Sequence, residues 1–286
     1  MTEVALTRPP ASFRPDRLEV IQSVGKRAPI EFATGVQWDC LIGPHNGAKN
    51  LTTGQLTLVP HTRLALHRYP VSESITVLSG QVVVSVEGRE YALGPLDNLV
   101  IPRALAHSVR NDAGALAQVH LAFPSARPTR EWVTESFEPR ALTEMATCPP
   151  GKERVTRFKT APRSEAGPGT SFIDYFNQDL MPGLEMSGGY GAFRTGGRLP
   201  AHFHDFDESI CIIDGTATCI VEGRRHQMSD GATALQPRGR VHYFINESPE
   251  PMAMIWVYAG PLPERIVTDE CCATASGDPW KAAGLV

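Results

Sequence analysis

Four residues of types that bind metal ions lie close together in the second half of the sequence. His202 and His204 are separated by one residue, Glu208 follows four positions later, and His242 lies further along the chain. Because alternate side chains of a strand share a face, His202 and His204 point the same way, and Glu208 does so too if the strand continues. We expect His242 to supply a fourth ligand from a later strand. Three imidazoles and one carboxylate suit Fe(II), Mn(II), Ni(II), Cu(II) or Zn(II), with one or two coordination positions left open.

The segment that holds these residues has a counterpart earlier in the chain. Residues 67–111 align with residues 202–246 at a constant offset of 135 positions and without a gap. Within this alignment, eight of the seventeen positions of 73–89 are identical to those of 208–224. Such similarity at a fixed offset is typical of a duplicated domain. We therefore expect two units of the same fold.

The composition of the chain places the boundary between these units. Residues 141–170 are polar, contain several Pro and Gly residues and have no apolar periodicity, which is typical of a linker. We expect an N-terminal domain over residues 1–140 and a C-terminal domain over residues 171–286.

Both units have the pattern of short strands joined by turns. Runs rich in β-branched residues are followed by Glu87-Gly88 in the first unit and by Glu222-Gly223 in the second, which predicts a hairpin in each. Asp214-Gly215 is expected to form a further hairpin turn. Since no amphipathic helical pattern separates the strands, the sequence predicts an all-β sandwich or barrel.

These motifs resemble those of the cupin superfamily. Its first motif is H-x-H, three or four residues, E, six residues and G, and its second is P-x-G-x-x-H-x-x-x-N. The matching residues are His202, His204, Glu208 and Gly215 for the first motif, and Pro237, Gly239, His242 and Asn246 for the second. The two units together cover most of the chain, as in bicupins. The resemblance implies two tandem jelly-roll barrels with a metal ion in the lumen of the C-terminal one.

The first unit departs from the first motif at one ligand position. It keeps His67, Glu73 and His107, but Tyr69 stands where the second histidine belongs. A neutral phenol, with a reference pKa of about 10, is a poor ligand for most divalent ions at pH 7. We expect a metal-poor or empty barrel in which Tyr69 forms a hydrogen bond with His67 or Glu73, and a weaker second metal site is the alternative.

Positively charged and aromatic residues near the C-terminal motif are candidates for substrate binding. An arginine of this region would clamp a substrate carboxylate, although surface arginines are often solvated and some of these have counterparts in the first unit. The candidates are Arg194, Arg198, Arg238, Arg240, Tyr190 and Tyr243.

The motifs specify ligands and leave the reaction open. We favour a dioxygenase with one Fe(II) ion that acts on a small phenolic, enol or keto-acid substrate. The first alternative is a decarboxylase, isomerase, lyase or hydrolase of a small hydroxy or keto acid, in which the metal is a Lewis acid and no redox step occurs. The second alternative is a non-catalytic cupin that binds a small molecule.

The bulk composition limits the partners. With a net charge of −4 and no run of Lys or Arg residues with interleaved aromatics, the chain is not expected to bind nucleic acid. It has no stretch of eighteen apolar residues, and we expect a cytoplasmic protein with no membrane partner. The six cysteines are irregularly spaced and are expected to be reduced thiols. A homodimer is expected, because the edges of jelly-roll sheets often pair.

Overall fold

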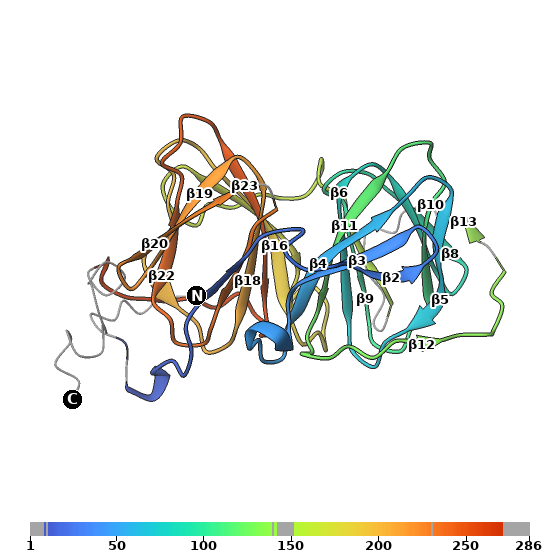
Figure 1. The fold of residues 1–286 in the computed structure, drawn as a ribbon, viewed down its shortest axis with the longest axis horizontal. Helices are drawn as coiled ribbons and strands as arrows, with labels where there is room; N and C mark the ends of the chain where they lie inside the picture. The colour runs from blue at the N-terminus through green and yellow to red at the C-terminus, as the bar shows by residue number, and fades with distance from the viewer. Residues whose placement is uncertain (1–8, 10, 139, 142–151, 230, 271–286) are drawn as a thin grey trace.

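The computed structural model describes residues 9, 11–138, 140–141, 152–229 and 231–270. These residues form two β-barrels that lie side by side, one built from the first half of the chain and one from the second (Figure 1). Strands dominate, and two short 3₁₀ helices, η1 (Ala11–Phe13) and η2 (Pro44–Asn46), accompany them. No helix among the described residues is both long and apolar enough to cross a membrane. The predicted all-β fold of two tandem barrels is confirmed.

The N-terminal barrel consists of a seven-stranded and a six-stranded sheet that enclose one apolar core. The seven-stranded sheet has the order β14 (Arg154–Thr156), β9 (Asn98–Ile101), β6 (Glu73–Ser79), β11 (Ala117–Phe123), β4 (Thr52–Leu58), β3 (Val36–Ile42) and β2 (Ile30–Ala33). The six-stranded sheet has the order β12 (Glu131–Trp132), β5 (Thr62–Arg68), β10 (His107–Asn111), β7 (Val82–Val86), β8 (Arg89–Leu93) and β13 (Arg140–Ala141).

The C-terminal barrel repeats this plan with a six-stranded and a five-stranded sheet. The six-stranded sheet has the order β1 (Val20–Gln22), β21 (Thr233–Gln236), β18 (Glu208–Asp214), β23 (Met252–Tyr258), β16 (Ser187–Phe193) and β15 (Thr170–Phe176). The five-stranded sheet has the order β20 (Arg224–Ser229), β19 (Thr216–Val221), β22 (His242–Ile245), β17 (His202–Phe203) and β24 (Ile266–Val267).

Strand β23 shows why some strands are apolar without alternation. All seven of its residues are buried. Met254 and Trp256 face the lumen of the C-terminal barrel, whereas Ile255 and Val257 face a second core that also contains Leu51 of the N-terminal barrel. A strand buried on both faces needs apolar residues at every position. The barrels are therefore joined through the backs of two sheets, where the hydroxyls of Thr53 and Ser209 also form a buried 2.8 Å hydrogen bond.

Short segments cross the predicted domain boundaries. Strand β1, from the first 25 residues, pairs with β21 of the C-terminal barrel, and Phe13 packs edge-on against Phe203 at a ring-centroid distance of 5.1 Å. Strand β14, from the expected linker, pairs with β9 of the N-terminal barrel. Residues 142–151 of that linker lie outside the described residues. In the structure, each barrel is thus completed by a segment from beyond its expected range.

The turns show both a confirmed and a wrong prediction. Glu87 and Glu222 have φ angles of 46° and 48°, and each is followed by a glycine with φ of 84°, as a tight hairpin with two positive-φ residues requires. The expected hairpin at Asp214-Gly215 is wrong, because β18 and β19 lie in different sheets. Gly215, with φ of 67°, instead turns the chain from one sheet of the barrel to the other.

Three of the cysteines lie in the described part of the chain. Cys40, Cys211 and Cys219 are free thiols, as predicted. Burial raises the pKa of Cys40 and of Cys211 to about 11, which disfavours the reactive thiolate. The other three, Cys148, Cys271 and Cys272, lie outside the described residues.

Candidate metal centre

The four predicted ligands come from three strands and one connection of the C-terminal barrel. His202 lies on β17 directly opposite His242, the first residue of β22. The strand ends at Phe203, so His204 lies in the connection that follows, and Glu208 begins β18 in the facing sheet. The strand does not continue from His202 to Glu208, so the shared face that was conditional on it does not explain the position of Glu208. The barrel brings them together by closing one sheet over the other.

The side chains of these four residues converge in the barrel lumen. One potential ligand atom of each lies within 4.8 Å of those of the others. The Nε2 atom of His242 is 2.8 Å from a carboxylate oxygen of Glu208, and that of His204 is 3.3 Å from the same oxygen. All four residues are at most 2% exposed, so the site is dry enough for strong electrostatic interactions.

Backbone carbonyls fix the orientation of all three imidazoles. The Nδ1 atoms of His202, His204 and His242 lie 2.7, 2.7 and 2.8 Å from the carbonyl oxygens of Pro200, Glu264 and Arg240. If each Nδ1 carries the proton and donates it, the lone pair of each Nε2 faces the lumen, which is the arrangement that metal-binding histidines use. The Nε2 of His204 is buried without a hydrogen-bond partner. A buried nitrogen lone pair without a hydrogen-bond donor is available to bind a cation.

The electrostatics of the cluster also suit a cation. Burial, together with the neighbouring imidazoles, lowers the pKa of His202 well below its usual value, and burial lowers that of His204. Burial alone would raise the pKa of Glu208, but the interactions with His204 and His242 hold it well below its usual range. Neutral imidazole and ionised carboxylate are the states in which these side chains bind metal.

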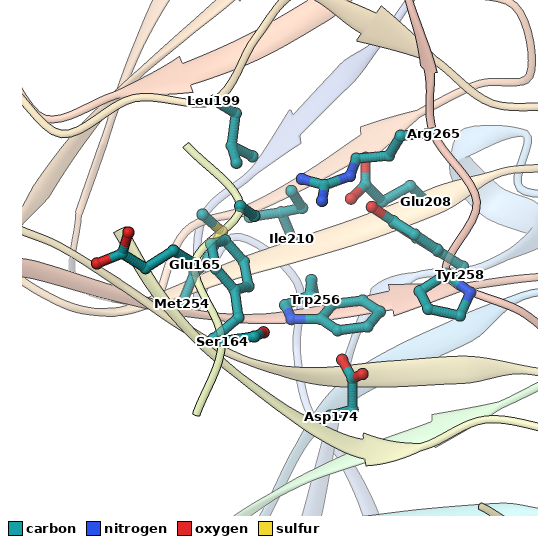
Figure 2. Close-up of a pocket in the computed structure, with 13 residues that line it drawn as sticks. Ser164, Glu165, Asp174, Leu199, Glu208, Ile210, Met254, Trp256, Tyr258 and Arg265 are labelled. Carbon is teal, nitrogen blue, oxygen red and sulfur yellow. The ribbon is translucent and has the colours of Figure 1, made fainter. Parts of the chain in front are cut away.

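A small cavity opens beside the cluster and includes Glu208 in its wall (Figure 2). Its volume is about 140 Å³. One part of the wall is apolar, formed mainly by Ile210, Met254 and Trp256. The remaining lining residues are Ser164, Glu165, Ala166, Phe172, Asp174, Leu199, Tyr258, Pro263 and Arg265. A space of this size admits a molecule of only a few heavy atoms.

Arg265 is the principal cation of this cavity. Figure 2 shows its guanidinium beside Glu208 and Tyr258. Within the described part of the chain, no carboxylate lies at ion-pair distance from Arg265. The indole Nε1 of Trp256 is likewise buried without a hydrogen-bond partner. An unpaired guanidinium and an unpaired N–H donor in one small cavity are suited to a carboxylate ligand.

Asp174 supplies an acidic group to the same cavity. Burial raises the pKa of its carboxyl, and Arg265 partly opposes this effect. Its side chain keeps contact with solvent at the cavity edge, and Figure 2 shows it below Trp256. Asp174 can therefore retain a proton to higher pH than an ordinary aspartate, which is a property of a proton donor.

Arg265 is not among the residues predicted from the sequence, although a signal for it exists. The offset of 135 positions places Pro263 and Arg265 over Pro128 and Arg130, so the P-x-R pattern occurs in both units. This pattern lies beyond Asn246, where the aligned motifs end. Arg265 and Arg130 each line a cavity in their own barrel.

None of the arginines chosen from the sequence lines this cavity. Three of them bind acidic residues elsewhere, and Arg194 is exposed. The observed pairs are Arg198 with Glu270 at 2.5 Å, Arg238 with Asp205, and Arg240 with Glu222 at 2.5 Å. The two tyrosines also lie outside the cavity wall. Tyr190 packs against Phe158 at 4.9 Å, and the Tyr243 ring lies under Arg198.

The N-terminal barrel holds a second cluster of three potential ligands. His67, Glu73 and His107 are buried, and one ligand atom of each lies within 4.8 Å of the others. The Nε2 of His107 is 2.6 Å from the Glu73 carboxylate, and the Nε2 of His67 is buried without a hydrogen-bond partner. The Nδ1 atoms of the two histidines again contact backbone carbonyls, at 2.7 and 3.0 Å.

Tyr69 does not form the expected hydrogen bond with His67 or Glu73. Its hydroxyl instead accepts a 3.0 Å hydrogen bond from Nε of Arg130. The phenol ring packs edge-on against His67, with 5.4 Å between ring centroids. Burial raises the pKa of Tyr69, which keeps the phenol neutral and a poor metal ligand. The expectation is wrong because an arginine from beyond the motif reaches the hydroxyl.

Comparisons with known proteins agree with this architecture. A family model described as Cupin domain matches residues 54–122 and 190–258. No curated protein matches the chain. The formate complex of Lactobacillus farciminis oxalate decarboxylase is similar at a TM-score of 0.70 and 15% identity, over 91% of each chain. The S161A mutant of Bacillus subtilis oxalate decarboxylase is similar at a TM-score of 0.69 and 15% identity, over 90% of this chain and 81% of that one. At this identity the likeness establishes a shared fold.

Proposed function

The chain belongs to the cupin superfamily as a two-domain cupin, and on this premise we propose that its C-terminal barrel is the active site of a metal-dependent decarboxylase for a small keto or hydroxy acid. This is the first alternative from the sequence analysis. The two solved structures reported above as similar in fold are oxalate decarboxylases, and they favour this alternative over the dioxygenase.

One observation carries the proposal: the unpaired guanidinium of Arg265 lies beside Glu208 in a cavity of only about 140 Å³. A substrate in this space must be small, and it must bring its negative charge close to the ligand cluster. These requirements describe a short carboxylic acid with a second oxygen function.

The residues that would hold the metal ion are His202, His204, Glu208 and His242. A divalent ion bound there supplies a Lewis acid that withdraws electrons from a carbonyl or hydroxyl oxygen of the substrate. The metal identity stays a prediction, with Fe(II) favoured from the sequence and Mn(II), Ni(II), Cu(II) and Zn(II) as alternatives.

The chain's own residues then bind the substrate and supply a proton. Arg265 and the Trp256 N–H hold the carboxylate. When the bond from the carboxylate carbon to its neighbour breaks, CO₂ leaves and the electron pair stays on the neighbouring carbon. Asp174 donates a proton to that carbon, and its raised pKa suits this role. The apolar wall of Ile210 and Met254 limits the entry of competing water.

The dioxygenase remains the second candidate function. The apolar wall of the cavity supports it, because such a wall protects reactive oxygen species from side reactions. The non-catalytic binding protein is disfavoured, since a polar cavity with an unpaired arginine and an acid of raised pKa is typical of catalytic sites. The homodimer and the cytoplasmic location stay predictions.

The test is a turnover assay on protein loaded separately with each candidate metal. The assay supplies a panel of two- to four-carbon keto, hydroxy and dicarboxylic acids both with and without oxygen, and it measures released CO₂ and oxygen uptake. CO₂ release that occurs without oxygen, and without oxygen uptake when oxygen is present, is the expected result. Turnover that occurs only with stoichiometric oxygen consumption would contradict the decarboxylase and favour the dioxygenase.

A further inference from the structure

The N-terminal barrel has a larger cavity of its own. Its volume is about 680 Å³, within the range of sites that bind organic molecules of moderate size. Four aromatic residues and three arginines contribute to its wall, and no acidic residue does. The lining residues are Arg27, Ile30, Phe32, Trp38, Cys40, Pro44, His45, Thr52, Tyr69, Phe123, Ala126, Arg127, Pro128 and Arg130.

The aromatic residues form a connected wall for a flat ligand. The rings of Phe32 and Trp38 are stacked at a centroid distance of 5.9 Å and an interplanar angle of 21°. Phe123 packs edge-on against Trp38 at 6.5 Å and lies 4.7 Å from Tyr69. Trp38, Tyr69 and Phe123 are at most 6% exposed, so their positions are fixed by the barrel core. These rings and the partly buried Phe32 give the cavity an apolar aromatic lining against which a flat ligand can pack.

Arg130 brings a positive charge to this wall. Its guanidinium carbon lies 3.7 Å from the Phe32 ring centroid, and its Nε donates to the Tyr69 hydroxyl. Among the described residues, no carboxylate pairs with Arg130, Arg27 or Arg127, and the terminal nitrogens of Arg130 have no hydrogen-bond partner. Stacking and the bond to Tyr69 hold the guanidinium in place for a bidentate contact with an anion.

The cavity is separate from both ligand clusters. None of the residues of either cluster is among its lining residues. Tyr69 stands between it and the His67 cluster, with its ring against His67 on one side and Phe123 on the other. The tyrosine at the position of the motif histidine therefore contributes an aromatic surface to the cavity.

We propose that this cavity binds an aromatic carboxylate, with the ring against Phe32 and Trp38 and the carboxylate on Arg130. This ligand is distinct from the small acid of the C-terminal site, because the two cavities differ in volume by several-fold and only the N-terminal one has a stacked aromatic wall. The binding does not depend on the function proposed for the C-terminal barrel.

Calorimetric titration of the full chain with 2-naphthoate tests the proposal. We expect saturable binding, with at least tenfold weaker binding of the neutral analogue 2-naphthalenemethanol and of acetate, which lacks the ring. Arg130→Met should weaken naphthoate binding at least tenfold, because it removes the charge but keeps an apolar side chain over Phe32. Arg163→Met is the matched control, since Arg163 lies over the Phe158 ring at 4.8 Å and outside this cavity.

A second variant covers the case in which Arg130→Met lowers the melting temperature. Ala126→Trp keeps all three arginines and adds a bulky ring to the cavity wall, so it too should weaken naphthoate binding at least tenfold. The proposal is overturned if naphthoate does not bind up to about 10 mM, if inorganic phosphate binds as tightly, or if a folded Ala126→Trp protein binds naphthoate as tightly as wild type. Loss of binding in Arg265→Met but not in Arg130→Met would also overturn it, because the ligand would then occupy the C-terminal barrel.

Discussion

Replacing Arg265 by methionine removes the charge that we expect to hold the substrate carboxylate. The methionine keeps much of the length and apolar volume of the arginine, so the cavity wall stays closed. Because no described carboxylate lies at ion-pair distance from the guanidinium, its removal breaks no ion pair among the described residues. A hydrogen bond to a charged group contributes about 1.5–3 kcal/mol. At 1.4 kcal/mol for each factor of ten, we predict that kcat/KM falls roughly 10- to 150-fold.

The assay is steady-state CO₂ release at varied substrate concentration, with the metal content of each variant measured in parallel. If Arg265 binds the substrate and the transition state equally, Arg265→Met should have a higher KM than wild type and nearly the same kcat. Arg265→Lys should recover part of the loss. Arg198→Met is the matched control, because Arg198 was a candidate from the sequence but pairs with Glu270 outside the cavity. Equal losses in Arg265→Met and Arg198→Met, or no loss in Arg265→Met at full metal content, would refute the role of Arg265.

Three further predictions concern other positions. Asp174→Asn should lower kcat by about 10²- to 10⁴-fold. The rate of wild type should fall as pH rises through the raised pKa of Asp174, and this fall should be absent in the variant. An unchanged pH–rate profile would exclude Asp174 as the acid. Burial lowers the pKa of His120 to about 4, so its protonation destabilises the fold by up to roughly 3 kcal/mol as pH falls from 6.5 to 4. Urea unfolding at several pH values should show a weaker acid dependence for His120→Leu than for wild type. Tyr69→His completes the four-residue motif and should raise the metal content by about one ion per chain, measured by elemental analysis.

Much of the fold was predictable because the duplication constrains it. The same offset that aligns the motifs also aligns Gly54 with Gly189, and a Cβ at either position would lie 2.1 Å from a carbonyl oxygen of the neighbouring strand. A glycine that recurs at the same offset therefore marks a close approach of two strands in each unit. The four ligands were predictable because their spacing matches the two motifs, although they lie on three strands and one connection.

Other features depend on contacts that the sequence pattern does not encode. The exchange of β1 into the C-terminal barrel rests on long-range pairing with β21, and no local signal marks it. The partner of Tyr69 is an arginine 61 positions away. The candidate arginines were chosen because they are close to the motifs in sequence, but acidic residues such as Glu270 bind them outside the cavity. Arg265, which does line the cavity, lies after β23 and beyond the motifs.

The most direct test of the metal centre is the metal content of the folded protein. Wild type loaded with a divalent metal and freed of excess should retain about one ion per chain that depends on the C-terminal cluster. His202→Ala and His242→Ala should each lose that ion, while circular dichroism still shows folded barrels. Retention of the full ion content in both variants, with loss in His67→Ala instead, would contradict the assignment of the metal to the C-terminal barrel.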